Sequence, residues 1–316
     1  MPDIIAVGEI LVEIMASRRG QSFLETGTLL GPYPSGAPAI TADQAALAGA
    51  SCAMIASVGD DDFGRLNLMR LQNDGLDISG IKIKPGYATG AAFVAYDNDG
   101  GRQFIYHFER SAAGALSAED VSETLISRYK YLHICGCSLC AGAALRDAVL
   151  KAVRGAEKNG VKISFDPNLR PELLSGDAIN EAFTEIISKT SILLTGRSEL
   201  GILFPGRSDN DVLSLLRGSD GVLVIKDGKN GAKIASNSGV ETVRGFSVNE
   251  VDPTGAGDCF NGAFLARLCK GDALRDAALY ANAAGALSVT KQGPMSGHAC
   301  DEIEKLIKLT KGDCSA

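Results

Sequence analysis

The feature that most restricts the fold of this chain is an alternation of short apolar runs with helical patterns. The first run, Ile4–Val7, is continuously apolar, as in a strand buried on both faces. Further strands are predicted at residues 52–59, 131–135, 162–166, 191–195 and 221–226. Helices are predicted at residues 39–49, 63–73, 143–159, 178–188, 198–204, 210–217, 260–270 and 300–310. Alternation with short connections predicts an α/β fold whose mostly parallel sheet is covered by helices on both faces.

One segment departs from this alternation. Residues 89–108 read as two strands joined by the turn sequence Asn98-Asp99-Gly100-Gly101, which is typical of a β-hairpin. Antiparallel strands within a β–α pattern predict a small sheet set apart from the main one. The Pro- and Gly-rich run 31–38 is expected to be irregular. No repeat or linker divides the chain, so a single domain over residues 1–316 is expected.

Composition and charge narrow the possible partners. The 316 residues carry a formal net charge of −7 without any block of Lys and Arg, which argues against nucleic acid and anionic membranes. All apolar runs are shorter than the roughly 18 residues of a membrane span. The N-terminus lacks the basic start of a signal peptide. We therefore expect a cytoplasmic protein.

The eight cysteines are scattered, and only Cys135, Cys137 and Cys140 form a close group. A closed zinc site needs four ligands, usually as two close pairs, and the sequence offers no second pair. We expect reduced thiols, with this group buried at the end of a strand.

The strongest indication of chemistry is the run Asp252-Pro-Thr-Gly-Ala-Gly-Asp258, between a strand-like segment at 240–248 and a helical pattern from about residue 260. A helix N-terminus offers unpaired N–H groups and a positive dipole end, and both attract anions. The stretch from Gly255 to Gly257 has almost no side chain, so a phosphate can approach its backbone. Asp258 follows in the first helical turn. A phosphate site beside a fixed carboxylate indicates phosphoryl transfer, with the carboxylate as base for a hydroxyl.

The same run resembles the C-terminal signature of the ribokinase-like (PfkB) carbohydrate kinases. The resemblance covers nearly the whole chain, and the nearest branch is that of 2-keto-3-deoxygluconate and tagatose-type sugar kinases. It implies a three-layer α/β/α fold with a small β-sheet lid, formed by about residues 11–35 and 88–108, and a homodimer through that lid. It implies ATP and Mg²⁺ as cofactors and leaves a monovalent cation such as K⁺ open. The catalytic base would be Asp258, and the transferring phosphoryl group would be held by Gly255, Ala256 and Gly257.

The resemblance assigns two N-terminal positions to the sugar. Glu13 stands at the offset of an acid that binds sugar hydroxyls, with a solvated strand end as the alternative. The segment from Ser35 to Ile40 is similar to a Gly-Gly sugar-binding motif, but Ser35 replaces the first glycine and Ile40 an asparagine. Gly36 would still allow a sugar to approach the backbone.

Three later residues are also assigned to the substrate. Tyr106 matches a substrate-contacting aromatic of the ketogluconate kinases, although His107-Phe108 follows where that branch usually has an arginine. The run Asp-Pro-Asn-Leu-Arg matches a family pattern in which Asn168 and Arg170 would reach the transferred phosphate or a substrate oxygen. The alternative for this run is a turn held by its Asp and Asn side chains.

Other residues are assigned to the nucleotide and its metal. Glu199 matches the acid of an Asn-x-x-Glu magnesium motif in which Gly196 replaces the asparagine. Mg²⁺ retains several waters, so Glu199 would act through water, with a helix-start Glu as the alternative. The expected nucleotide contacts are Lys226, Gly228, Gly231, Thr254, Gly255, Gly257 and Asn282.

These features predict an ATP-dependent sugar kinase acting on a ketose of the tagatose or fructose kind, or on a 2-keto-3-deoxygluconate-like sugar. The missing arginine after Tyr106 favours the neutral ketose. A nucleoside kinase of the same fold is an alternative. An NAD-dependent dehydrogenase would need Gly-x-Gly-x-x-Gly after the first strand, where the chain has only Gly8-Glu9. The changes at Ile40 and Gly196 leave an inactive sugar-binding protein open, although Asp258 argues against it.

Overall fold

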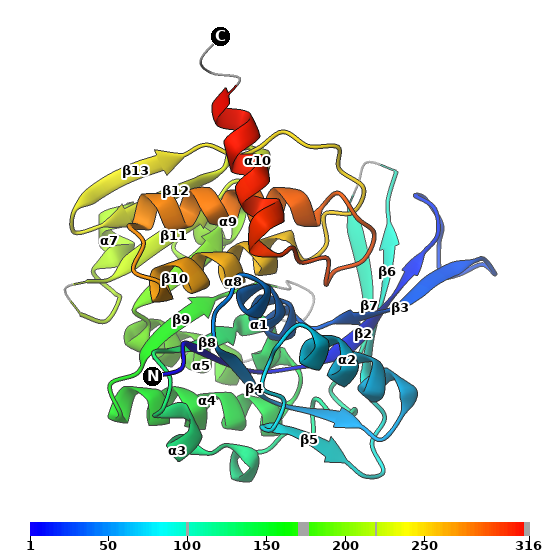
Figure 1. Cartoon of the computed structure of the whole chain (residues 1–316). Coiled ribbons are helices and arrows are strands. Elements are labelled where there is room, and N and C mark those ends of the chain that lie inside the picture. The colour runs from blue at the N-terminus through cyan, green and yellow to red at the C-terminus, as the bar shows by residue number, and fades with distance from the viewer. Residues whose placement is uncertain (99–100, 170–176, 219, 313–316) are drawn as a thin grey trace.

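The structure is a computed structural model that describes residues 1–98, 101–169, 177–218 and 220–312. Its strands form a 9-stranded sheet in the order β13-β12-β11-β10-β9-β8-β1-β4-β5 and a 4-stranded sheet in the order β3-β2-β6-β7 (Figure 1). From β11 to β5 all neighbours in the large sheet are parallel, whereas β12 and β13 are antiparallel. The predicted α/β fold, with a mostly parallel sheet and a separate small sheet, is confirmed.

The elements have the following bounds. The strands of the large sheet are β1 (Ile4–Val7), β4 (Cys52–Gly59), β5 (Ile81–Lys84), β8 (Tyr131–Cys135), β9 (Lys162–Asp166), β10 (Ile192–Gly196), β11 (Val222–Lys226), β12 (Ala232–Ser236) and β13 (Gly239–Val243). Those of the small sheet are β2 (Leu11–Ala16), β3 (Leu29–Ser35), β6 (Gly90–Tyr96) and β7 (Arg102–His107). The helices are α1 (Ala37–Leu47), α2 (Asp62–Asn73), α3 (Glu123–Ile126), α4 (Ala143–Lys158), α5 (Asp177–Lys189), α6 (Arg197–Leu203), α7 (Asp209–Leu213), α8 (Ala256–Cys269), α9 (Leu274–Ser288) and α10 (Cys300–Gly312).

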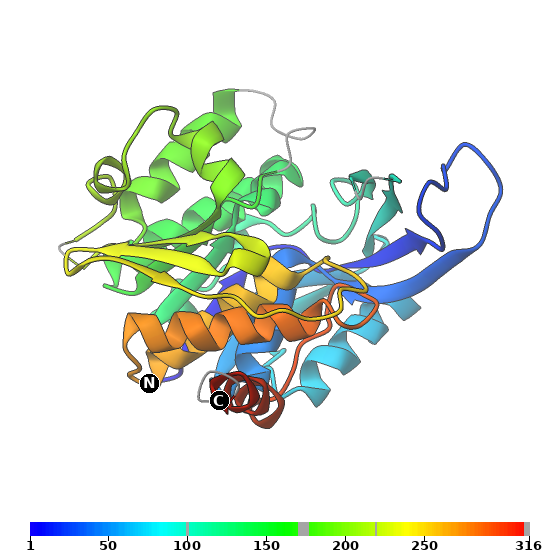
Figure 2. The same cartoon turned by 90° about the horizontal axis from the view of Figure 1, so that it is seen from above.

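Helices cover both faces of the large sheet because successive strand residues point to opposite faces. Ile4 and Leu194 belong to the core that includes α1, α8 and α9. Their neighbours Ile5 and Leu193 belong to the core that includes α4 and α5. Figure 2 shows the resulting layers, with the small sheet extending beyond them on one side.

Polar side chains gather along one edge of the large sheet. The carboxyl ends of parallel strands meet at a common edge, which is where ligands of open α/β sheets bind. Asp166 is the last residue of β9, Lys226 is the last of β11, and Glu9 follows β1. The small sheet continues from β1 through β2, so it lies beside this edge (Figure 1).

Several local expectations were wrong. The run 31–38 is largely regular: β3 contains Pro32 and Pro34, which are tolerated because β3 is an edge strand. Helix α1 begins at Ala37 with Pro38 in its first turn, where a missing N–H breaks no helical hydrogen bond. Strands β5 and β12 were not predicted, and the extended segment before the glycine loop ends at Val243.

The described cysteines are free thiols, with Cys135 and Cys137 buried at the end of β8. Within residues 1–98, 101–169, 177–218 and 220–312, no group of three or more His, Cys, Asp or Glu side chains could hold a metal ion. In the same ranges, no helix combines the length and the apolar character needed to cross a bilayer.

The packing of α8 on α1 gives a first prediction, because α8 carries Asp258. A Cβ at Gly262 would lie 2.2 Å from the Thr41 carbonyl oxygen and 2.8 Å from the Ala45 nitrogen. Gly262→Ala should therefore push the two helices apart and lower the free energy of unfolding by about 1–3 kcal/mol, as overpacking does. Urea unfolding measures this change.

The matched control is Gly201 in α6, where a Cβ would meet nothing within 4 Å. Gly201→Ala should leave the stability unchanged or raise it by up to about 1 kcal/mol, because alanine is the better helix former. Equal stability of the Gly262→Ala variant and the wild type would contradict the close approach of α1 and α8.

Candidate functional site

The glycine loop runs directly into α8, which begins at Ala256 and so earlier than predicted. Gly255 is the N-cap, with φ of 78° in the left-handed region. A Cβ there would also lie 2.0 Å from the Pro294 carbonyl oxygen, so only glycine fits. The backbone N–H groups of Gly255, Ala256 and Gly257 therefore lie at the positive end of the helix dipole. The N–H of Ala256 makes one long hydrogen bond there, of 3.5 Å, to the Pro253 oxygen.

Asp258 lies in this first turn and is held from outside the helix. Its side chain is 8% exposed, and its Oδ1 accepts a hydrogen bond from Asn168 Nδ2 at 3.2 Å. Asn168 has φ of 41°, and its backbone N–H donates to Asp166 Oδ1 at 3.0 Å. The turn after β9 is thus held by Asp and Asn side chains, and it also fixes the orientation of the Asp258 carboxylate.

A buried charge network supports the same loop. Asp166 Oδ2 accepts hydrogen bonds from Lys226 Nζ at 2.7 Å and from Asn261 Nδ2 at 2.6 Å. Lys226 Nζ also donates to Asn261 Oδ1 at 3.1 Å. Burial alone would lower the pKa of Lys226, but the carboxylates of Asp166, Glu199 and Asp258 outweigh it and raise the pKa, so the ammonium stays charged.

This cation lies beside the glycine loop: a Cβ on Gly257 would be 3.4 Å from Lys226 Nζ. The helix N-terminus and the ammonium together favour an anion at this point.

A first cavity, here called the acid-side cleft, lies between the small sheet and the start of α8. The residues that line it include Glu9, Glu13, Ser35, Gly36, Ile40, Arg102, Phe104, Tyr106, Cys137, Thr254, Gly255 and Asp258. Four predicted substrate residues, namely Glu13, Gly36, Tyr106 and Asp258, are therefore brought together. The cleft is narrow, with a volume of about 60 Å³.

The carboxylates of this cleft are held by neighbouring side chains. Glu13 is 7% exposed, so the alternative of a solvated strand end is wrong. Ser35, the departure from the family pattern, donates its hydroxyl to Glu13 Oε1 at 2.7 Å. Glu9 accepts hydrogen bonds from Ser138 Oγ and Cys137 Sγ. Burial raises the pKa of Glu9, although these two donors partly offset the effect.

A second cavity, here called the loop-side cavity, has a volume of about 590 Å³. The residues that line it include Lys226, Gly228, Gly231, Phe246, Val248, Pro253, Ala256, Gly257, Phe260, Asn282 and Gly285. Of the predicted nucleotide residues, Thr254 and Gly255 instead line the acid-side cleft, and the others lie here. The size and apolar lining are typical of a small-molecule site.

Asn282 Nδ2 in this cavity donates to the backbone oxygens of Val243 at 3.2 Å and Arg244 at 2.9 Å. It therefore fixes the chain where β13 ends.

Glu199 caps the start of a helix, as in the alternative to a magnesium ligand. Its Oε2 accepts from Gly196 N at 2.7 Å and its Oε1 from Leu169 N at 2.7 Å. The carboxylate therefore closes the start of α6 and ties it to the turn after β9. Arg170 lies outside the described residues.

Several residues of the site were not predicted from the sequence. Asp166 could have been found as the polar end of a buried strand, and Asn261 as the residue one helical turn after Asp258. Phe104 and Arg102 alternate with Tyr106 along β7, so they share its face. For Glu9 and Cys137, no pattern in the sequence indicates that they meet.

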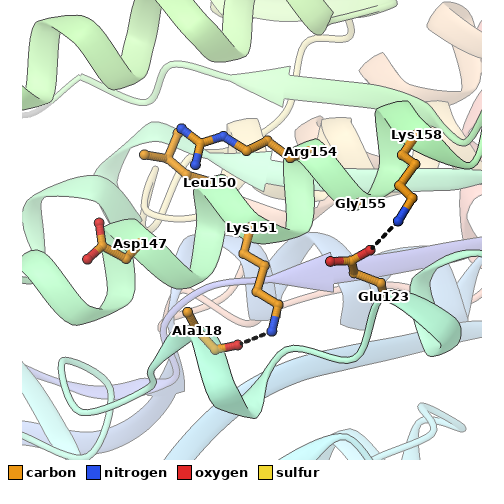
Figure 3. A pocket seen from close by; sticks show the side chains of 8 residues that line it. All are labelled: Ala118, Glu123, Asp147, Leu150, Lys151, Arg154, Gly155 and Lys158. Atoms are coloured by element: carbon orange, nitrogen blue, oxygen red, sulfur yellow. Dashed lines mark hydrogen bonds and ion pairs between the residues drawn. The ribbon is translucent and has the colours of Figure 1, made fainter.

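Another groove, of about 450 Å³, runs along α4 and is lined by Lys151, Arg154 and Lys158 (Figure 3). Lys151 Nζ donates to the Ala118 carbonyl oxygen at 2.7 Å, and Lys158 Nζ lies 3.8 Å from Glu123 Oε2. Arg154 pairs with Glu185 at 2.7 Å. Each of these cations has a partner in the protein, so its charge is already partly compensated.

The sequence and the fold of the chain match those of known proteins. The model described as "pfkB family carbohydrate kinase" matches residues 1–299. Fructokinase-1 of Zea mays is 33% identical over 96% of this chain and 98% of its own length. An E. coli protein solved with ATP and Mg²⁺ is 41% identical, covers 98% of this chain and 100% of its own, and has a TM-score of 0.91.

A double mutant of fructokinase from Vibrio cholerae, solved with fructose, ADP and a potassium ion, is 25% identical to this chain. It covers 97% of this chain and 98% of its own, with a TM-score of 0.81.

The backbone at Asn168 gives a second prediction. Asn168→Ala and Asn168→Gly both remove the hydrogen bond to Asp258, but only alanine places a Cβ on a left-handed residue. Asn168→Ala should therefore be less stable than Asn168→Gly by about 1 kcal/mol. Denaturant unfolding of the two variants measures the difference, and equal stabilities would show that the strained turn is absent.

Proposed function

Because this chain belongs to the pfkB family of carbohydrate kinases, we propose that it transfers the γ-phosphoryl group of MgATP to a hydroxyl of a ketohexose of the fructose or tagatose kind. One observation carries the proposal. The segment 253–258 has Asp258 on the acid-side cleft and Ala256 and Gly257 on the loop-side cavity. A sugar in the cleft and a nucleotide in the cavity would therefore meet at the first turn of α8.

The reaction then follows from the roles of these groups. The Asp258 carboxylate accepts the proton of the sugar hydroxyl, whose oxygen attacks the γ-phosphorus. An O–P bond forms to the sugar, the bond from the γ-phosphorus to the bridging oxygen breaks, and ADP leaves. The N–H groups of Gly255, Ala256 and Gly257 stabilise the charge on the transferring group. Asn168 orients Asp258, and Lys226 adds positive charge beside the loop.

Mg²⁺ would arrive with ATP and neutralise phosphate charge. Both Glu199 oxygens already accept hydrogen bonds from backbone N–H groups, so we propose that this carboxylate acts on the hydrated metal through water.

The V. cholerae fructokinase was solved with a potassium ion. A monovalent cation such as K⁺ stays a prediction for this chain.

The charges of the acid-side cleft support a neutral sugar. Glu9, Glu13 and Asp258 all line it, and they would repel a substrate carboxylate. Phe104 and Tyr106 offer aromatic surface to the apolar face of a sugar ring, and the hydroxyl-binding role of Glu13 and Gly36 stays part of the proposal. The fructokinases among the relatives point in the same direction.

Arg102 supports a second candidate. It lines the acid-side cleft from the small sheet and could pair with the carboxylate of a 2-keto-3-deoxygluconate-like substrate. The dehydrogenase alternative is wrong, because a kinase family model matches residues 1–299. A nucleoside acceptor is left to the substrate screen.

We also propose that residues 1–316 form one kinase domain, with the segments 11–35 and 88–108 as its lid and with dimer contacts through that lid.

Removal of the base tests the catalytic role. Asp258→Asn keeps the shape of the side chain but cannot take up the proton, so kcat should fall by about 10²–10⁴-fold, while the affinity for MgATP changes little. Asp276→Asn is the matched control, because Asp276 is an exposed acid in the first turn of α9. Near-normal turnover by Asp258→Asn would refute the role.

A coupled ADP-release assay with MgATP should test D-fructose, D-tagatose, 2-keto-3-deoxygluconate and the common ribonucleosides. The cleft charges predict the highest kcat/KM for a ketohexose. A higher value for the sugar acid would favour the second candidate, and Arg102→Gln should then raise KM for that acid by about tenfold or more, as loss of a charged hydrogen bond does.

A further inference from the structure

Tyr96, the last residue of β6, links the small sheet to the glycine loop. Its phenol donates a hydrogen bond to Asp252 Oδ1 at 2.8 Å and lies 2.8 Å from Thr254 Oγ1. The phenol has one hydrogen, which Asp252 receives, so the Thr254 hydroxyl donates to the Tyr96 oxygen. Burial and the neighbouring Asp252 carboxylate raise the pKa of Tyr96, so the phenol keeps its proton at physiological pH.

Asp252 is a fixed point. Its side chain is 1% exposed, and besides Tyr96 it accepts from Thr254 N at 3.0 Å, Gln292 Nε2 at 3.1 Å and Gly293 N at 3.0 Å. A buried carboxylate with this many donors has a defined orientation. Tyr96 is therefore bound to the rigid start of the loop.

The loop that follows Asp252 lines a different cavity on each of its two sides. Thr254 and Gly255 line the acid-side cleft, whereas Pro253 and Ala256 line the loop-side cavity. Interiors are close-packed and transmit displacement. A shift of this loop therefore changes both cavities.

A sugar in the acid-side cleft would lie between the small sheet and the start of α8, because residues of both line the cleft. Tyr96 belongs to that sheet and is hydrogen-bonded to the glycine loop. A movement of the sheet on sugar binding would therefore shift the loop or break these hydrogen bonds.

We infer that Tyr96 is a positioning residue that couples the two substrate sites, so that sugar binding under the small sheet sets the loop that receives the nucleotide. The inference rests on the proposed function, because it needs a sugar in the cleft and a nucleotide in the cavity. Coupling of this kind is reciprocal, and a typical size is about 5–150-fold in affinity.

The test compares Tyr96→Phe, which keeps the ring and removes the hydroxyl, with the wild type. The dissociation constant of MgAMP-PNP is measured by calorimetry without and with saturating ketohexose, D-fructose or D-tagatose, whichever is turned over. The coupling ratio is the dissociation constant without ketohexose divided by that with it. In the wild type this ratio should be at least about 5. In Tyr96→Phe the ratio should fall at least threefold or reach 1. A wild-type ratio of 1, or an unchanged ratio in the variant, overturns the inference.

Tyr33→Phe is the matched control. Tyr33 is also in the small sheet, and a Cβ on Gly293 would lie 2.8 Å from Tyr33 Cδ1, so its ring packs against the same C-terminal segment. The pair of hydrogen bonds that Tyr96 makes to Asp252 and Thr254 is not touched by this change. Tyr33→Phe should keep the wild-type coupling ratio. If Tyr33→Phe lost as much coupling as Tyr96→Phe, the loss would come from packing of the small sheet in general and not from the hydrogen bonds of Tyr96.

Hydrogen exchange gives a readout that needs no sugar. MgAMP-PNP should slow amide exchange in β6 of the wild type and of Tyr33→Phe, and leave β6 unaffected in Tyr96→Phe. Equal protection in all three proteins overturns the inference.

The two proposals fail in distinguishable ways. Absence of turnover with either ketohexose would defeat the proposed substrate, whereas turnover with coupling that survives in Tyr96→Phe defeats only the role of Tyr96.

Discussion

The structure depends on how the chain is held where the glycine loop becomes a helix. Helix α8 offers its N-terminal N–H groups only because Gly255 adopts a left-handed conformation and lies almost against the backbone of Pro294. Asp252 fixes the start of the same loop with hydrogen bonds from backbone and side-chain donors. The rest of the fold supplies the two cavities that this loop divides. An anion hole of this kind needs no cationic side chain of its own, since the backbone provides the donors.

The polar groups behind the loop compensate one another's charge. Asp166 is 2% exposed and would be costly to bury alone. Lys226 and Asn261 satisfy it, while Asn168 connects it to Asp258. These residues come from β9, β11 and α8, so the network also fixes how the helix sits on the sheet. The Asp258 carboxylate therefore has a defined orientation before any substrate binds, which would reduce the reorganisation needed in the proposed reaction.

The fold is well predicted from the sequence where burial imposes a clear pattern. The strands buried on both faces, such as β1 and β8, are wholly or largely apolar runs. The prediction fails for β5 and β12, which are short strands near the edges of the sheet, and for β3, where the two prolines suggest irregular chain.

For the site, Asp258 and the glycines are local in sequence and were found from their motif. Glu9 and Tyr96 were not, because each acts through contacts with residues far away in the chain. In the sequence Ser35 is a departure from the family's glycine motif, and in the structure it donates a hydrogen bond to Glu13.

The most direct measurement is a crystal structure of the protein with MgAMP-PNP and a ketohexose. The terminal phosphate should lie within hydrogen-bonding distance, about 2.7–3.2 Å, of the N–H groups at the start of α8. A sugar hydroxyl should lie between that phosphate and the Asp258 carboxylate. A nucleotide bound away from the loop-side cavity, or a sugar whose hydroxyls all point away from Asp258, would contradict this arrangement.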